Sequence, residues 1–476
     1  MTIIFFSFIL TSDVKTNRLE VDIFLGEDIM ITNTNLFTKT LKNGEIVIVP
    51  QRLKDAIVES NLIKSDGKFL YYHDSSLKIL RKLSDNINLS LRQHLFSKDI
   101  QRFINKNILD TIIDDLMVDT RIQIDSQELN PEYLINLKNG IFNLKNLQFI
   151  PDKSQCNKLF TYVINANYQP NVQEKDFSNF NKFLTTAFQN DDELQRYFLE
   201  NIGFLLSSVN SFRKVVIFLG EHASGKSSMA RFISKLIFPN DLVSHVNFQD
   251  LSSRFSTYEV ATAKLNVGDE MIKSKLKNLA KFKSITAGEK ITVEQKCKNP
   301  IKIKPNVRQL YTANDLPEFD DGNMLAIFDR LNIVPFNISI PQSKRKFTLV
   351  DDLLAEKDAI VSFALQSFAN VCRNSGVFSI PKEVIALNKI YLNEANSIQR
   401  FIKNHVILDE QIKGISTKEL YRLYSQFCID EDFTPKSSKV FSEIILRTFK
   451  NIERKKIRVG EKTFNAFTKL RYKDSE

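Results

Sequence analysis

An eight-residue glycine loop near the middle of the chain constrains the fold more than any other feature. Residues 220–227 read Gly-Glu-His-Ala-Ser-Gly-Lys-Ser, a complete Walker A motif. The apolar run 215–219 predicts a buried strand before the loop, and residues 227–238 predict an amphipathic helix after it. A glycine-rich turn between a strand and a helix directs backbone N–H groups at one point, which favours binding of a polyphosphate.

The motif therefore predicts a site for ATP and Mg²⁺. We expect Lys226 to reach the β- and γ-phosphates and Ser227 to hold Mg²⁺. A glycine loop that only turns a corner between two elements is the alternative interpretation. The nucleotide-binding residues predicted from the motif are Gly220, Glu221, His222, Ala223, Ser224, Gly225, Lys226, Ser227 and Ser228.

Polar residues at the ends of two further apolar runs fit the same chemistry. Asp269 and Glu270 follow the predicted strand 264–268. Asp269 can hold Mg²⁺ through its water shell while Glu270 polarises the attacking water. Asn314 follows the predicted strand 308–313, where an amide can orient that water or contact the γ-phosphate. A surface acidic pair and a turn asparagine are the alternatives.

Arg330 is the last candidate catalytic residue along the chain. As an arginine finger it would complete the site of a neighbouring subunit and supply positive charge to the transition state. An arginine in a surface salt bridge is the alternative. The predicted catalytic set is Lys226, Asp269, Glu270, Asn314 and Arg330.

The most basic part of the chain lies between the acidic pair and the predicted strand 308–313. Residues 273–304 contain ten lysines against two glutamates. Residues 291–295 and 301–303 alternate as two strands of a hairpin do, with residues 296–300 at the tip. A lysine-tipped hairpin beside a nucleotide site suits a moving contact with a phosphate backbone. A solvated hairpin is the alternative.

The pattern changes again after residue 391. Helices are expected at 398–407, 417–429 and 439–449, followed by strands around Gly460-Glu461. Three helices and a hairpin in this order are typical of a winged helix. From residue 436 onward, twelve basic residues stand against five acidic ones, which favours duplex DNA over a protein partner, the alternative. The candidate DNA contacts are Lys436, Lys439, Lys455, Lys456 and Arg458.

Composition bounds the remaining choices. The 476-residue chain predicts several domains, and its formal net charge of +10 favours an acidic polymer as partner. Four cysteines without paired or metal-ligand spacing favour a reducing compartment, here the cytoplasm of a host cell. The apolar run 3–10 is too short to span a bilayer and is expected to be a buried strand rather than a signal peptide, so we expect no membrane partner.

The N-terminal part carries weaker signals. Short strand-like runs are expected up to about residue 70, helices over 75–117, a hairpin over 137–150 and a helical block over 176–208. One acidic cluster resembles the metal site of a primase, but an exposed helix face is the simpler interpretation. Its members are Asp114, Asp115, Asp119 and Asp125.

The ordered motifs resemble those of the superfamily 3 helicases, in particular the phage, plasmid and poxvirus-type primase-helicase family. The resemblance rests on GEHASGKSS, KLNVGDE, KSITAGEKITVEQKCKNPIKIKP, LYTANDLP and FDRLNIVPF. It extends upstream through LINLKNGIFNLKNLQFIP and YFLENIGFLLSS, and downstream through LLAEKDAIVSFALQSFANV and GVFSIPKEV. It covers residues 65–470 in outline.

This resemblance implies a hexameric ring that hydrolyses ATP between subunits and moves 3′→5′ along single-stranded DNA. By position, it implies that Lys226 and Ser227 bind phosphate and Mg²⁺ and that Asp269 and Glu270 form the Walker B pair. It also implies that Asn314 is the sensor and Arg330 the arginine finger. Lys296 and Lys298 would be the hairpin residues that touch DNA. The chain departs from many members because the part before the helical region is too short for a primase domain.

Taken together, the patterns predict a multidomain α/β protein with a P-loop AAA+-type ATPase core on a parallel sheet. We expect an N-terminal α+β region at 1–150, a helical oligomerisation collar at 151–208, an ATPase motor at 209–390 and a winged helix at 391–476.

The expected function is that of an ATP-dependent replicative DNA helicase and initiator of a mobile element, plasmid or virus. Its expected partners are single-stranded DNA, duplex origin DNA, further copies of itself in a homo-hexamer, and a separate primase or loading factor. The main alternative is a DNA-binding initiator whose ATPase is an assembly switch without processive unwinding. A packaging ATPase and a small-molecule kinase fit less well, because neither needs the lysine hairpin.

Overall fold

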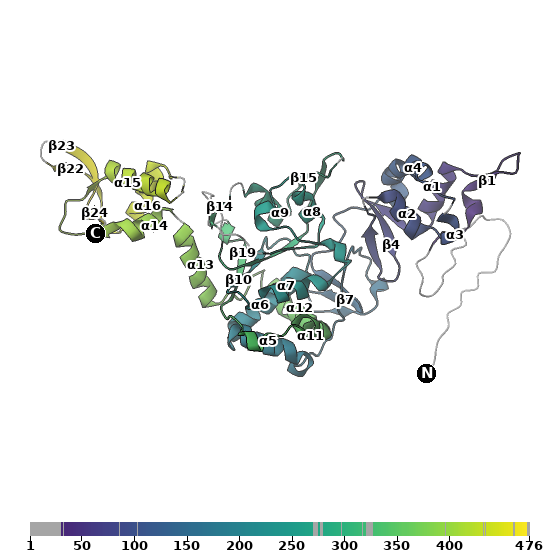
Figure 1. Ribbon diagram of the computed structural model, residues 1–476, viewed down its shortest axis with the longest axis horizontal. Coiled ribbons are helices and arrows are strands. Elements are labelled where there is room, and N and C mark those ends of the chain that lie inside the picture. The colour runs from purple at the N-terminus through teal and green to yellow at the C-terminus, as the bar shows by residue number, and fades with distance from the viewer. Residues whose placement is uncertain are drawn as a thin grey trace. The chain divides into compact units, whose positions relative to one another are not determined.

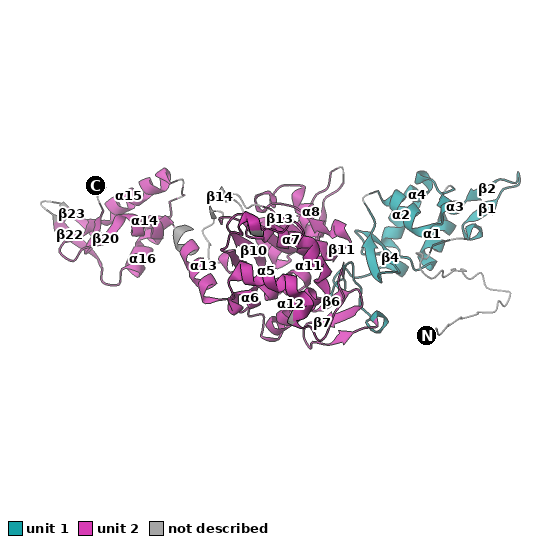
Figure 2. Ribbon diagram, turned by 60° about the horizontal axis from the view of Figure 1, so that its bottom comes forward, with its two compact units in different colours: residues 1–131, 153–163 teal, residues 132–152, 164–476 magenta. Residues whose placement is uncertain are grey.

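Two units make up the protein. The computed structural model describes residues 30–473 apart from 32, 85, 102, 270–274, 277–278, 297, 317, 320–326, 396, 432, 434 and 460–461. Unit 1 comprises residues 1–131 and 153–163, and unit 2 comprises residues 132–152 and 164–476 (Figure 2). The run 3–10, predicted to be a strand, lies outside the described residues. None of the described helices is long and apolar enough to cross a membrane.

Unit 1 packs short helices against small antiparallel sheets. Leu53, Ile57, Leu91, Leu109 and Leu116 are among the residues of its buried core. Its described elements are β1 (Thr38–Thr40), β2 (Ile46–Ile48), α1 (Pro50–Glu59), β3 (Ile63–Ser65), β4 (Leu70–Asp74), β5 (Ile79–Lys82), α2 (Ile87–Leu95), α3 (Lys98–Gln101) and α4 (Lys106–Val118).

The structure corrects two predictions in this unit. Residues 50–59 form a helix, although they fall in the region expected to contain strands. Pro50 suits the first turn of a helix, and Leu53, Ala56 and Ile57 share a buried face only at helical spacing. Conversely, β5 lies within the region predicted to be helical, and its residues instead pair with β4.

Among the described residues of unit 1, the acidic cluster singled out in the sequence does not assemble into a metal site. Asp114 and Asp115 are exposed on α4. Asp119 forms salt bridges with Lys54 at 3.2 Å and Arg121 at 2.8 Å, and these lower the pKa of its carboxyl. Within the described ranges, no group of three or more side chains could hold a metal ion.

A five-stranded parallel sheet forms the centre of unit 2, in the order β12-β13-β17-β10-β19; Figure 1 labels β10 and β19 of this sheet. The predicted strands at 215–219, 264–268 and 308–313 are all present in it. Because the strands are parallel, their carboxyl ends lie at the same edge. Their bounds are β10 (Val215–Gly220), β12 (Val243–Ser244), β13 (Leu265–Gly268), β17 (Arg308–Ala313) and β19 (Leu331–Phe336).

Both faces of this sheet are buried, as expected for parallel strands. On one face, Val215 and Ile217 belong to a core with Val260 of α8 (Ser256–Thr262) and Phe282 of α9 (Ala280–Ala287). On the other, Phe218 packs its ring 5.6 Å from that of Phe198 in α6 (Asp192–Leu206). The side chains of the unbroken apolar run in β10 therefore pack into two cores, one on each face of the sheet.

The helix after the glycine loop is shorter than predicted. Helix α7 spans Lys226–Lys235, and Ile237–Phe238 form strand β11. A proline disfavours helical geometry at the residue before it, and Phe238 precedes Pro239. The carbonyl of Leu236 accepts a hydrogen bond from the N–H of Asn165 at 2.7 Å, so the chain leaves the helix to pair elsewhere.

Strand β11 belongs to a second sheet, in the order β11-β9-β6-β7-β8. This sheet contains the hairpin predicted over 137–150, although its first strand begins earlier, at Leu134. The bounds are β6 (Leu134–Leu137), β7 (Gly140–Asn143), β8 (Phe149–Ile150) and β9 (Val163–Ile164).

Helices before and after the parallel sheet pack on one another. The block predicted at 176–208 forms α5 (Ser178–Phe188) and α6, and α6 lies against α12 (Lys357–Arg373), as Figure 1 shows. Glu356 accepts hydrogen bonds at 2.9 Å from the N–H groups of Asn179 and Phe180, so it caps α5 from a distant part of the chain. Helices α11 (Leu349–Ala355) and α13 (Lys382–Ala395) flank α12 in sequence.

The C-terminal part of unit 2 contains the helices and strands predicted there. A separate core includes Phe401, Tyr424 and Phe441. The hydroxyl of Ser416 accepts a hydrogen bond from the N–H of Glu419 at 3.4 Å and caps the second helix. The elements are α14 (Ser397–His405), β20 (Val406–Leu408), β21 (Ile415–Ser416), α15 (Thr417–Asp430), α16 (Ser438–Thr448), β22 (Arg454–Val459), β23 (Lys462–Phe467) and β24 (Leu470–Tyr472).

Candidate functional site

The glycine loop connects the carboxyl end of β10 to the first residue of α7. Gly220 has φ +149° and Gly225 has φ +95°, a backbone region that favours glycine. A Cβ atom on Gly220 would lie 2.1 Å from the carbonyl oxygen of Phe336, and one on Gly225 would lie 2.8 Å from the ring of Phe183. Both glycines are therefore required by packing as well as by conformation.

Lys226 is buried and turns its ammonium back into the loop. Its Nζ donates hydrogen bonds to the carbonyl oxygens of Gly220 at 2.7 Å and Glu221 at 2.6 Å. The same atom lies 3.2 Å from Oδ1 of Asn314, which follows β17. Strands β10 and β17 are neighbours, with Leu219 beside Ala313, so the sheet itself brings these two residues together.

Asn314 also contacts the third residue of the loop. Its Nδ2 lies 3.2 Å from Nε2 of His222. The loop is held from its other side as well, because the hydroxyl of Ser339 donates to the carbonyl of His222 at 3.0 Å. Lys226, Asn314 and His222 thus form one connected polar group.

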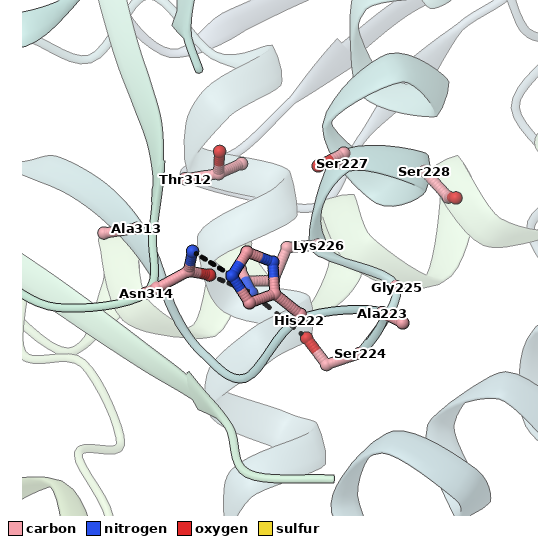
Figure 3. A pocket seen from close by; sticks show the side chains of 10 residues that line it. All are labelled: His222, Ala223, Ser224, Gly225, Lys226, Ser227, Ser228, Thr312, Ala313 and Asn314. Atoms are coloured by element: carbon pink, nitrogen blue, oxygen red, sulfur yellow. Dashed lines mark hydrogen bonds between the residues drawn. The ribbon is translucent and has the colours of Figure 1, made fainter. Parts of the chain in front are cut away.

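These residues surround a pocket of about 150 Å³ at the N-terminus of α7 (Figure 3). Ser227 is exposed on the first turn of that helix. A helix N-terminus with a nearby ammonium favours an anionic ligand. The pocket is lined by His222, Ala223, Ser224, Gly225, Lys226, Ser227, Ser228, Thr312, Ala313 and Asn314.

Most of the predicted nucleotide-binding residues line this pocket. Gly220 and Glu221 contribute through the carbonyls that hold Lys226. Sequence reasoning missed Thr312 and Ala313, which enter the pocket because they precede Asn314 at the end of β17. Their position in an apolar strand gave no sign of a ligand.

Asp269 lies at the same edge of the sheet as the pocket. It follows β13, whose Gly268 lies beside Tyr311 of β17. The side chain is exposed and is not among the residues that line the pocket. Glu270 lies outside the described residues, so the structure describes only one member of the predicted pair.

Arg330 lies at the opposite edge of the sheet. Its carbonyl accepts a hydrogen bond from the N–H of Val215 at 2.7 Å, which places it at the amino end of β10. Strands rise about 3.3 Å per residue, so the length of β10 separates Arg330 from the loop by roughly 17 Å. The structure therefore does not bring Arg330 to the loop of its own chain.

The lysine hairpin forms as predicted. Strands β15 (Ile291–Val293) and β16 (Ile301–Ile303) are antiparallel, with Ile291 beside Ile303. Lys296 and Lys298 are exposed in the connection between them. Of the ten lysines, those at 273 and 277 lie outside the described residues.

Two residues that sequence reasoning missed lie beside the hairpin. Phe255 is 43% exposed, and the Nζ of Lys296 lies 5.7 Å from the centroid of its ring. The guanidinium of Arg254 lies 5.7 Å from the same centroid and pairs with Glu294 of the hairpin. The pattern Arg254-Phe255 carries no signal of its own, because an aromatic residue before a helix is usually taken for core.

The candidate DNA contacts of the C-terminal part are spread over its surface. Lys439 lies on α16, and Lys455, Lys456 and Arg458 lie on β22; all four are exposed. Lys455 pairs with Glu453, which lowers the pKa of that carboxyl. Lys436 precedes α16. Its carbonyl accepts a hydrogen bond from the hydroxyl of Tyr421, and its N–H donates one to the hydroxyl of Tyr424.

Two family models match the chain. One, described as "D5 N terminal like", matches residues 51–189. The other, described as "Family of unknown function (DUF5906)", matches residues 218–330, which include the loop, Asn314 and Arg330. The first match supports a relation to phage-type primase-helicases without singling out superfamily 3, and the second assigns no chemistry. No curated protein matches the chain.

Solved structures of low sequence identity are also similar to the chain. "The A form apo structure of NrS-1 C terminal region-CTR" is 12% identical with a TM-score of 0.48, over 87% of this chain and 98% of that one. "The apo structure of NrS-1 C terminal region" is 13% identical with a TM-score of 0.46, over 88% and 99%. Similarity at this level carries no argument about function.

Proposed function

We propose that this protein is an ATP-dependent DNA helicase and replication initiator of the superfamily 3 type, serving a mobile element, plasmid or virus. The D5 N terminal like match supports a replication-related role. The observation that carries the proposal is the contact of Lys226 with Asn314, because it joins the predicted phosphate-binding lysine to the predicted sensor across neighbouring parallel strands.

In this proposal the loop is the P-loop of an AAA+-type core and takes ATP with Mg²⁺. Lys226 would neutralise the β- and γ-phosphates, and Asn314 would contact the γ-phosphate or orient the attacking water. Ser227, together with Asp269 through water, would hold Mg²⁺, which would supply charge stabilisation to the transferred phosphoryl group. Glu270 would polarise the attacking water.

A ring of identical subunits, expected to be a hexamer, would explain the placement of Arg330. The residue lies at the opposite edge of the sheet from the loop, and it can supply transition-state charge only to a neighbouring subunit's ATP. The collar helices α5 and α6 are the proposed oligomerisation segment.

The hairpin would be the part that moves DNA. Lys296 and Lys298 supply positive charge to the backbone, and Phe255 offers an exposed ring on which a base can stack. Coupled to ATP hydrolysis, this surface would draw one strand through the ring in the 3′→5′ direction.

We further propose that the C-terminal part is a winged helix that binds duplex DNA at an origin. Its order of α14, α15, α16 and the β22–β23 hairpin fits that fold, and basic residues are exposed on the last helix and the hairpin. Phosphate contacts of this kind position a domain on DNA without reading sequence. A separate primase or loading factor remains a proposed partner, and host cytoplasm the proposed location.

Strand displacement on a forked duplex tests the proposal. The wild-type protein and Lys226→Ala are compared with ATP and Mg²⁺ on a fork with a 3′ tail and on one with a 5′ tail. We expect displacement only by the wild type and only from the 3′ tail. Displacement from the 5′ tail would contradict the direction, and displacement by the variant would contradict the motor assignment.

The second candidate is an initiator whose ATPase switches assembly without processive unwinding. The exposed basic residues of the C-terminal part favour this role as much as they favour the helicase. ATP turnover and origin binding without displacement from either fork would support it over the helicase.

A further inference from the structure

His222 occupies a variable position of the glycine loop, yet its side chain lies among the residues expected to bind phosphate. Figure 3 shows its imidazole beside the amide of Asn314, and His222, Asn314 and Lys226 all line the pocket. The contact of its Nε2 with Nδ2 of Asn314 is 3.2 Å long. The Walker A motif specifies no side chain at this position.

The chemistry of the three residues sets the direction of each hydrogen bond. The ammonium of Lys226 only donates, so the Asn314 atom facing it at 3.2 Å must be the oxygen Oδ1. Asn314 therefore presents its NH₂ group to His222, and that group only donates. Nε2 of His222 is therefore the acceptor in this contact.

A phosphate oxygen also only accepts, and it needs the same donors. The terminal phosphate of a triphosphate that reached Lys226 and Asn314 would compete with Nε2 of His222 for one N–H group. A diphosphate lacks that terminal phosphate, so we expect it to leave the contact between His222 and Asn314 intact.

We infer that His222 is a specificity-determining residue that distinguishes a nucleoside triphosphate from a diphosphate by competing for the amide of Asn314. The inference rests on the proposed nucleotide site. A hydrogen bond between neutral groups contributes about 1 kcal/mol net, so its loss on binding weakens triphosphate affinity by about threefold to tenfold. Asn314 would therefore leave its hydrogen bond with His222 only when a nucleotide with a third phosphate binds.

Equilibrium binding of fluorescent ADP and of a fluorescent, non-hydrolysable ATP analogue tests this inference. The full-length wild type is compared with His222→Ala, His222→Gln and the control His245→Ala, which removes an exposed histidine outside the pocket. We expect His222→Ala to bind the ATP analogue about threefold to tenfold more tightly, with ADP affinity within about twofold of wild type. Gln offers an acceptor oxygen, and we expect it to retain most of the wild-type discrimination.

Each outcome bears on a different statement. Unchanged or weaker binding of the ATP analogue to His222→Ala overturns the inference, and so does equal tightening of both nucleotides, which would indicate a change in the loop itself. Equal tightening in the Gln and Ala variants contradicts the acceptor role. A wild-type protein that binds neither nucleotide overturns the proposed function and this inference together, whereas binding of both with no effect of His222 overturns only the inference.

Discussion

Lys226 and Lys296 show two ways in which this protein uses the same side chain. Lys226 is only 6% exposed, and its ammonium donates to two loop carbonyls and to Asn314. Lys296 is exposed at a hairpin connection, and its described neighbour is the ring of Phe255 at 5.7 Å. A buried ammonium with several oxygen partners acts through geometry, whereas an exposed one acts through charge that salt screens.

The comparison predicts that one substitution in the loop is enough to abolish its function, whereas several lysines of the hairpin must be replaced to remove its function. In the loop, the ammonium of Lys226 has fixed partners in the carbonyls of Gly220 and Glu221 and in Asn314. Around the hairpin, other lysines supply the same charge when one is removed. The following variants are ordered from the largest expected effect to the smallest.

Lys226→Ala should give the largest loss. Without the ammonium, the site would lack its proposed cation for the β- and γ-phosphates, and we expect ATP hydrolysis to fall to background in a steady-state phosphate-release assay. Lys235→Ala is the control, because that lysine lies in the last turn of the same helix and is half-exposed. ATP turnover by Lys226→Ala near the wild-type rate would contradict the claim that the buried lysine is indispensable.

Arg330→Ala should preserve nucleotide binding but lower hydrolysis by roughly 1,000-fold, the low end for an arginine finger. Arg330 lies away from the loop of its own chain, so in the proposed ring only the chemistry of a neighbouring subunit's site would depend on it. Mixing Arg330→Ala with Glu270→Gln subunits should restore part of the turnover, measured against each variant alone. A mixture as inactive as its components would argue against a shared site.

Replacing Lys296 and Lys298 together by Ala should weaken single-stranded DNA binding by about tenfold at low salt. The slope of log affinity against log salt should fall by about 1.4, because each phosphate contact on a single strand contributes about 0.7. Unwinding should become uncoupled from ATP hydrolysis. The control replaces Lys382 and Lys389, two exposed lysines on α13; equal losses in both double variants would show only a general charge effect.

Phe255→Ala should give the smallest effect, a loss of about fivefold in single-stranded DNA affinity, since stacking on one base contributes about 1 kcal/mol or more. The salt slope should stay unchanged, which separates stacking from charge at the hairpin. Phe347→Ala is a matched control, because that ring is fully exposed. Fluorescence anisotropy with a short oligonucleotide at several salt concentrations measures both quantities; a changed slope would mean that Phe255 acts by placing Lys296.

The sequence predicted the local elements around the site well. The strand β10, the loop and the start of α7 follow from an apolar run, two glycines and a 3.6-residue period. The same reasoning failed where a local pattern was weak. It extended α7 through Ile237 and Phe238, and it read residues 50–59 as strand, because short apolar runs do not distinguish a helix from a strand.

Contacts between distant segments could not be predicted in the same way. Phe183 packs under Gly225 from a helix that precedes the sheet, and Arg254 and Phe255 approach the hairpin from the turn before α8. Each of these contacts depends on how helices pack on the sheet, and no spacing along the chain encodes it.

The sequence by itself determined which residues are candidates for phosphate binding and that a strand and a helix flank them, because turn chemistry and periodicity act between neighbours. Only the tertiary structure decided that Asn314 meets Lys226 and His222, and that Arg330 lies at the far edge of the sheet. Strand order and direction set these relations. They result from burying both faces of the sheet in the whole chain, which no local segment can specify.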